Sequence, residues 1–122
     1  MAPNAQRGEV EFEAGGETYT ARLDWNAIAL AEEAARCSYV DILDAFSAPP
    51  GEPLRVSIRV VRGLLWAGLQ QNHPRVKIED VGRLIGEIGP VAAVDVALRA
   101  LSFVLPAVIE DAPPADPRTP AA

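Results

Sequence analysis

Hydrophobic and polar residues alternate strictly over the first part of this chain. Two alternating runs, EVEFEA at 9–14 and ETYTAR at 17–22, flank Gly15-Gly16, a pair whose tolerance of positive φ angles suits a tight hairpin turn. Pairing the runs across that turn gathers Val10, Phe12 and Tyr19 on one face. The predicted partners are Glu9 with Arg22, Val10 with Ala21, Glu11 with Thr20, Phe12 with Tyr19, Glu13 with Thr18 and Ala14 with Glu17. A lone hairpin is marginal in water, so its apolar face must pack against another element.

After the second run, the spacing of the apolar residues changes to that of an α-helix. The alanine-rich segment 26–37 predicts a first helix, capped by Asp24 or Asn26. Ser38 is followed three residues later by Asp41, a spacing that resembles a capping box and opens a short second helix.

Three further helices are expected in the second half. They run over about 54–72, over about 77–88, and from Pro90 to about 105 or 109. Pro74 ends the first of these, because the residue before a proline avoids the α region. Gly89 suits the end of the next helix and Pro90 the first turn of the last. The predicted fold class is therefore α+β, an N-terminal β-hairpin followed by a small bundle of about five α-helices.

The two ends of the chain differ from the middle. Residues 1–7 (MAPNAQR) and 110–122 (EDAPPADPRTPAA) have no periodicity, and the second is dense in proline. We expect a flexible N-terminal arm and a disordered, proline-rich C-terminal tail. A single domain over about 8–109 remains. Because 49% of all residues are apolar and only 6% aromatic, its core should consist mainly of Leu, Ile, Val and Ala.

Composition excludes several classes of function. A net charge of −6 without a basic tail argues against nucleic acid as a partner, because phosphate neutralisation supplies most of that affinity. The longest apolar stretch, 91–109, contains Asp95 and Arg99, so no membrane span is predicted. Cys37 is the only cysteine and no secretory signal is visible, which favours a reducing compartment.

One tryptophan falls on an unexpected face of the long helix. At about 100° per residue, the leucines and valines cover one side, whereas arginines form a stripe on the other. The stripe consists of Arg55, Arg59 and Arg62, and Trp66 lies within it, one turn beyond Arg62. Trp66 either packs against another element of its own domain or, with the arginines, forms a surface for an acidic or amphipathic partner.

The last helix raises a related question. Asp95, Arg99 and Ser102 fall on one narrow strip, and apolar residues cover the rest, with Val96 and Phe103 on the outer side. A helix this apolar is either central in its own bundle or buried in another molecule. Self-association or partner binding through this helix and a purely internal role both remain open.

Residues for catalysis or metal binding are missing from the pattern. His73 is the only histidine, and its place at a helix end gives it a structural role through the helix dipole. No Cys/His cluster offers a metal site, and Cys37 has no base nearby in sequence, so it is expected to pack rather than react. We therefore expect no enzyme, no metal and no cofactor.

Two segments carry a resemblance to a known family. RGEVEFEAGGETYTARLDWNAIALAEE at 7–33 and VRGLLWAGLQQNHPRVKIEDVGRLIGEIG at 61–89 resemble a small family from gene transfer agents and related tailed phages, regarded as tail assembly chaperone-like and also labelled as a tail tube component. Its members share the R-G-E-V hairpin, the L-W-A-G-L…H-P helix end and an E-x-V-G-x-L-I-type helix. Relatives tend to have Ser or Thr where this chain has Lys77, which removes a helix cap worth about 1 kcal/mol.

The resemblance implies a non-enzymatic tail assembly chaperone. Such a protein binds the tape-measure protein, keeps its long hydrophobic helices soluble and assists tail tube assembly, with the tail tube protein as a second implied partner. It works in the cytoplasm of the bacterial host cell and is expected to be absent from the mature particle. The main alternative is a structural tail protein retained in the particle, and a DNA-binding regulator is a third reading. The candidate partner-binding residues are Arg55, Arg59, Arg62, Trp66, Val96 and Phe103.

Overall fold

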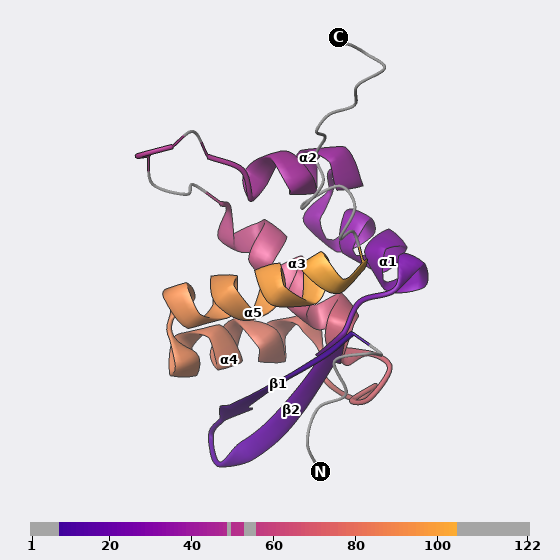
Figure 1. Ribbon diagram of the computed structural model, residues 1–122. Coiled ribbons are helices and arrows are strands. Elements are labelled where there is room, and N and C mark those ends of the chain that lie inside the picture. Colours follow the sequence, from indigo (N-terminus) through magenta and orange to yellow (C-terminus); the bar gives the residue numbers. More distant parts are fainter. Residues whose placement is uncertain (1–7, 49, 53–55, 105–122) are drawn as a thin grey trace, which may run out of the picture.

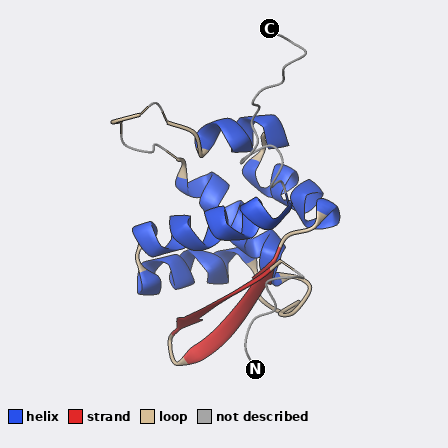
Figure 2. Ribbon diagram, in the orientation of Figure 1, coloured by secondary structure: helices blue, strands red, loops and turns tan. Residues whose placement is uncertain are grey.

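A β-hairpin precedes the helices in the computed structural model, which describes residues 8–48, 50–52 and 56–104 (Figure 1, Figure 2). The elements within those ranges are β1 (Glu9–Ala14), β2 (Glu17–Arg22), α1 (Trp25–Ala35), α2 (Tyr39–Ala45), α3 (Ile58–Leu69), α4 (Ile78–Ile88) and α5 (Pro90–Val104). The α+β class is therefore confirmed. The expected N-terminal arm, the expected C-terminal tail and the last residues of the expected domain lie outside the described residues.

The hairpin has the predicted register, from Glu9 opposite Arg22 to Ala14 opposite Glu17. Gly15 and Gly16 both have positive φ angles, 58° and 82°, as the favoured two-residue hairpin turn requires. On the inner face, the rings of Phe12 and Tyr19 stack with centroids 5.5 Å apart. Val10 and Ala21 beside them are buried, so this face closes one side of the core.

Helix α3 approaches both the hairpin and α1 closely, because glycines stand at the two crossings. A Cβ on Gly68 would lie 3.4 Å from the Cβ of Ala21 in β2, and one on Gly63 would lie 3.3 Å from the Cβ of Ala34 in α1. Small residues at a crossing let two backbones come together without a gap. α3 is thereby the central helix, in contact with α1, α4, α5 and β2.

The core is aliphatic, as the composition predicts. Every described element contributes to it, and the largest fully buried side chains are Ile42, Leu64, Leu65, Leu69, Leu101, Val61 and Val81. Within the described ranges no charged or polar residue is buried, and no aromatic residue reaches full burial there. The aromatic rings therefore lie at the margins of the core, where part of each ring remains accessible.

The long helix is shorter than its apolar pattern suggests. It begins at Ile58 rather than near position 54, because Ser57 is the N-cap and its side chain accepts a hydrogen bond from the Arg59 N–H at 3.0 Å. It ends at Leu69. Ile58, the first residue of α3, is 51% exposed.

At the start of α4, one of the two hydrogen bonds of a capping box is present. Lys77 is the N-cap and offers no side-chain acceptor, but the carboxylate of Asp80 accepts a hydrogen bond from the Lys77 N–H at 2.9 Å. Asp80 also forms an ion pair with Arg83. α5 follows after Gly89, whose φ angle of 92° allows the chain to turn back so that α5 lies beside α4 (Figure 1).

Candidate partner-binding surface

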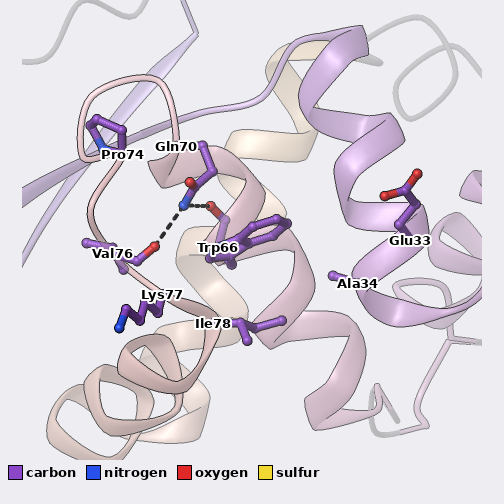
Figure 3. Close-up of a pocket in the computed structure, with 8 residues that line it drawn as sticks. All are labelled: Glu33, Ala34, Trp66, Gln70, Pro74, Val76, Lys77 and Ile78. Atoms are coloured by element: carbon purple, nitrogen blue, oxygen red, sulfur yellow. Dashed lines mark hydrogen bonds between the residues drawn. The ribbon is translucent and has the colours of Figure 1, made fainter.

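An apolar groove of about 520 Å³ opens beside Trp66. Its walls come from α1, from α3 and from the connection between α3 and α4 (Figure 3). The lining residues are Glu33, Ala34, Trp66, Gln70, Pro74, Val76, Lys77 and Ile78. We refer to it as the Trp66 groove.

Trp66 serves the core and the groove at once. Its side chain is partly buried and packs against the core cluster, while Figure 3 shows the indole turned toward α1 with Ile78 next to it. The orientation follows from the neighbouring glycines, since Gly63 and Gly68 must face α1 and β2 at the close crossings. Trp66 can therefore both pack within its own domain and contact a partner, because one part of the ring faces the core and another part faces the groove.

Gln70 fixes one wall of the groove. Its side-chain N–H₂ group donates to the backbone carbonyl of Trp66 at 3.2 Å and to that of Val76 at 3.1 Å. The two bonds, visible in Figure 3, tie the α3–α4 connection to the end of α3. A groove held by such bonds exists before a partner arrives, which reduces the entropy cost of binding.

Opposite charges stand on the two walls. Glu33 projects from α1 and Lys77 from the start of α4, and both side chains are exposed. The floor between them consists of apolar groups from Ala34, Trp66 and Ile78. This arrangement suits an amphipathic helix, whose apolar stripe enters the groove while charged residues on its flanks meet the walls.

The predicted arginine stripe is present in part. Arg59 is exposed, and Arg62 is partly buried with its Nε buried and without a hydrogen-bond partner among the described residues. Arg55 lies outside the described residues. The spacing of Arg59, Arg62 and Trp66 along α3 keeps these three on one side of the helix, and of the three Trp66 lines the groove.

The last helix is more internal than the sequence suggests. Val96, expected on an outer side, is 4% exposed, and that expectation is wrong because α5 packs against α3, α4 and β1. Phe103 is 42% exposed. Its inner edge lies over the start of β1, where a Cβ on Gly8 would come within 3.2 Å of the Phe103 Cβ.

The exposed strip of α5 is the predicted polar one. Arg99 pairs with Asp95 at 3.1 Å, and the Ser102 hydroxyl donates to the Arg99 carbonyl at 2.8 Å. Val91 at the N-terminal end of the helix is 83% exposed. Val91 and Phe103 are therefore the large apolar side chains that α5 exposes within the described residues.

A second aromatic pair, Trp25 and Tyr39, lies where α1 meets α2. Trp25 at the start of α1 is 58% exposed, whereas Leu23 just before it is buried. The ring of Trp25 meets Tyr39 of α2 edge to face, with centroids 6.1 Å apart. The helical pattern could have predicted this exposure. Asp24 is the N-cap, so α1 begins at Trp25, and the buried residues Ala27 and Ala31 lie on a different face of the helix from Trp25.

The described residues offer neither an activated cysteine nor a cluster of metal ligands. Burial raises the pKa of the half-buried Cys37 thiol, Asp41 and Glu32 add to the rise, and Arg59 opposes it. A thiol with a raised pKa is a poor nucleophile at neutral pH. Within 8–48, 50–52 and 56–104, no three Cys, His, Asp or Glu side chains gather as metal ligands would. No helix in those ranges has the length and hydropathy needed to cross a bilayer.

Comparison with known proteins places these features in a family. Residues 7–106 match the sequence profile of the family described as "Phage tail tube protein, GTA-gp10". No curated protein and no solved structure matches the chain. Because the profile covers the hairpin and all five described helices, the chain belongs to this phage tail tube and gene transfer agent family.

Proposed function

We propose that this protein is a non-enzymatic tail assembly chaperone that binds the tape-measure protein through the Trp66 groove and assists tail tube assembly. The chain belongs to a phage tail tube and gene transfer agent family, which supports a role in tail assembly. The observation that carries the finer proposal is the groove, an apolar floor between Glu33 and Lys77 on fixed walls. It has the form that an amphipathic helix of a client requires.

The fit to a helix follows from the chemistry of the groove. A helix presents a stripe of apolar residues at i, i+3, i+4 and i+7 to the groove that receives it. Trp66 and Ile78 offer apolar surface for such a stripe, and Arg59 lies beyond them on α3. A tape-measure protein rich in long apolar helices would otherwise expose that surface to water, so covering it before the tube forms keeps the client soluble.

The hairpin supports a helper role rather than a ring subunit. Tube rings built from sheets need free strand edges that pair between subunits. Here the described sheet has two strands, and the Thr20 N–H on the outer edge of β2 is already donated to His73 Nε2 at 3.0 Å. A chaperone of this kind works in the host cytoplasm and leaves before the particle is complete.

The second candidate is a structural tail protein, and the family description itself favours it, because it names the tail tube. A structural subunit stays in finished particles in many copies. In that case the Trp66 groove and Arg59 would be contacts between tail subunits rather than a client site.

Co-expression separates the two candidates. The full chain is expressed with the tape-measure protein of the same gene cluster, soluble complexes are captured, and purified particles are analysed by mass spectrometry. The chaperone proposal expects a soluble complex and no chain in particles, whereas presence in particles without a complex overturns it. Within the complex, Trp66→Ala should weaken capture and the matched Trp25→Ala should not. Unfolding curves of both variants show whether loss of capture reflects loss of folding.

A further inference from the structure

We infer that the exposed surface formed by Trp25, Tyr39 and Val40, the α1–α2 aromatic surface, is a second docking site that binds a basic amphipathic segment of another protein. It goes beyond the proposed chaperone function, and its binding test does not depend on the Trp66 groove. The reasons are the fixed geometry of the rings, the charge around them and their position relative to the groove.

The surface is apolar, exposed and preorganised. Trp25 is 58% exposed, Tyr39 42% and Val40 51%, and the two rings hold each other edge to face at 6.1 Å. Aromatic rings in this geometry attract each other beyond their burial. Exposed side chains that gather in one place, rather than scattering singly, mark interaction sites, and Trp and Tyr are the residue types most enriched in binding hot spots.

One hydrogen bond ties the start of α2 to α1, and two more close the capping box of α2. The Glu32 carboxylate accepts a bond from the Tyr39 N–H at 2.8 Å. The Ser38 hydroxyl accepts from the Asp41 N–H at 3.2 Å, and the Asp41 carboxylate accepts from the Ser38 N–H at 3.3 Å. A partner therefore meets a formed surface and does not have to order two loose helices.

The charge around the surface selects the partner. Four acidic residues lie on or beside the elements that hold the rings, namely Asp24, Glu32, Asp41 and Asp44, whereas Glu33 lines the Trp66 groove. Two cations oppose them, Arg36 after α1 and Arg59 of α3, whose charge acts on Cys37. Four acids against two cations leave a charge of −2 around the surface. Asp44 lies four residues after Val40 and is exposed, so it borders the apolar side chains. Lysine or arginine residues beside an apolar stripe are the complement of this pattern.

Two partners can be held at the same time. Ala34, which lines the Trp66 groove, lies nine residues after Trp25, and at about 100° per residue the two side chains leave α1 in opposite directions. α1 therefore separates the groove from the α1–α2 aromatic surface. A protein with two such sites can bring its client next to a second component of the assembly, and each contact can be measured alone.

The test uses the intrinsic fluorescence of the full chain. The chain has two tryptophans, so Trp66→Phe leaves Trp25 as the only one. This variant is titrated with a synthetic amphipathic helical peptide of leucine and lysine, and separately with a peptide of the same pattern in which glutamate replaces lysine. We expect a saturable shift of Trp25 emission with the leucine–lysine peptide, weakened by salt, and no saturable change with the leucine–glutamate peptide.

Matched variants assign the binding to this surface. Tyr39→Ser combined with Val40→Ser should weaken binding about tenfold, as removal of a hot spot does, and Asp44→Lys should weaken it several-fold. Glu13→Lys, the same charge change on the exposed face of the hairpin, should leave it unchanged. Equal binding of both peptides, full binding by the double variant, or an equal loss with Glu13→Lys would overturn the inference.

Self-association would also contradict it. A shift of Trp25 emission that depends on protein concentration alone, with a dimer in sedimentation analysis, would make the surface a contact between two copies. Thermal unfolding followed by circular dichroism controls for folding. Because the substituted side chains are exposed, we expect the variants to unfold at temperatures close to that of the parent protein.

Discussion

His73 Nε2 accepts a hydrogen bond from the backbone N–H of Thr20 at 3.0 Å, so the connection after α3 is fastened to the outer edge of β2. The imidazole also lies against the ring of Tyr19, with centroids 5.2 Å apart. The sequence predicts a structural role for this histidine but assigns it to the helix dipole. The structure shows that this role comes from a hydrogen bond instead, because His73 accepts from an N–H at the sheet edge that would otherwise face water or another chain.

Replacing His73 tests that contact. His73→Ala removes both the acceptor and the ring, and we expect it to lower the free energy of unfolding by about 1–2 kcal/mol, measured by urea denaturation. His73→Gln keeps a side-chain acceptor and should recover part of the loss. Hydrogen exchange of the Thr20 amide should become faster in the alanine variant. Unchanged exchange at Thr20 would show that the bond does not hold the edge.

The glycine at the α1–α3 crossing gives a second prediction. A Cβ on Gly63 would lie 3.3 Å from the Cβ of Ala34 and from the backbone nitrogen of Ala35, tighter than most side-chain contacts. We expect Gly63→Ala to destabilise the protein by about 1–3 kcal/mol, although alanine favours a helix. Thermal and urea unfolding measure the change.

Gly82 provides the matched control for Gly63. It lies within α4, it is exposed, and a Cβ there meets nothing within 4 Å. Gly82→Ala should therefore stabilise the protein by up to about 1 kcal/mol, the helix-propensity difference between the two residues. Opposite signs for the two substitutions are the expected result. Stabilisation by both would show that α1 and α3 are not as close as the structure places them.

Local patterns in the sequence predict the elements well, and tertiary contacts account for what they miss. The hairpin register follows from alternation and from Gly15-Gly16, and the Ser38 capping box follows from spacing, because each depends only on neighbours along the chain. Val96 was misplaced because its burial depends on which helices and strands cover α5. Trp66 was placed correctly beside Arg62, but the groove next to it needs Ile78 and Ala34 from other elements.

The thiol of Cys37 should react slowly. Burial first, and the carboxylates of Asp41 and Glu32, raise its pKa above the ordinary value, against the opposing effect of Arg59. Since the thiolate is the reactive form, the folded protein should react with a disulfide reagent more slowly at pH 8 than the same protein unfolded in urea. The rate should keep rising at pH values where an ordinary thiol is already ionised. Equal rates for the folded and unfolded chain would contradict the expectation.

Substitution of Lys77 should change the stability of the protein and client binding at the Trp66 groove in opposite directions. As N-cap of α4 it has a positive charge at the helix terminus that favours negative charge, and it offers no side-chain acceptor. Lys77→Glu should therefore raise the free energy of unfolding by about 0.3–1 kcal/mol. The same change makes both walls of the groove acidic, because Glu33 stands opposite.

Capture of the tape-measure protein should then fall while the melting temperature rises, and no loss of folding can explain that pair of results. Lys77→Ser is the matched comparison, because it supplies a cap without an acidic wall. It should raise stability and weaken capture less than Lys77→Glu does. If Lys77→Glu leaves capture unchanged in a co-expression assay, the client does not lie between these two walls, and the Trp66 groove is not its site.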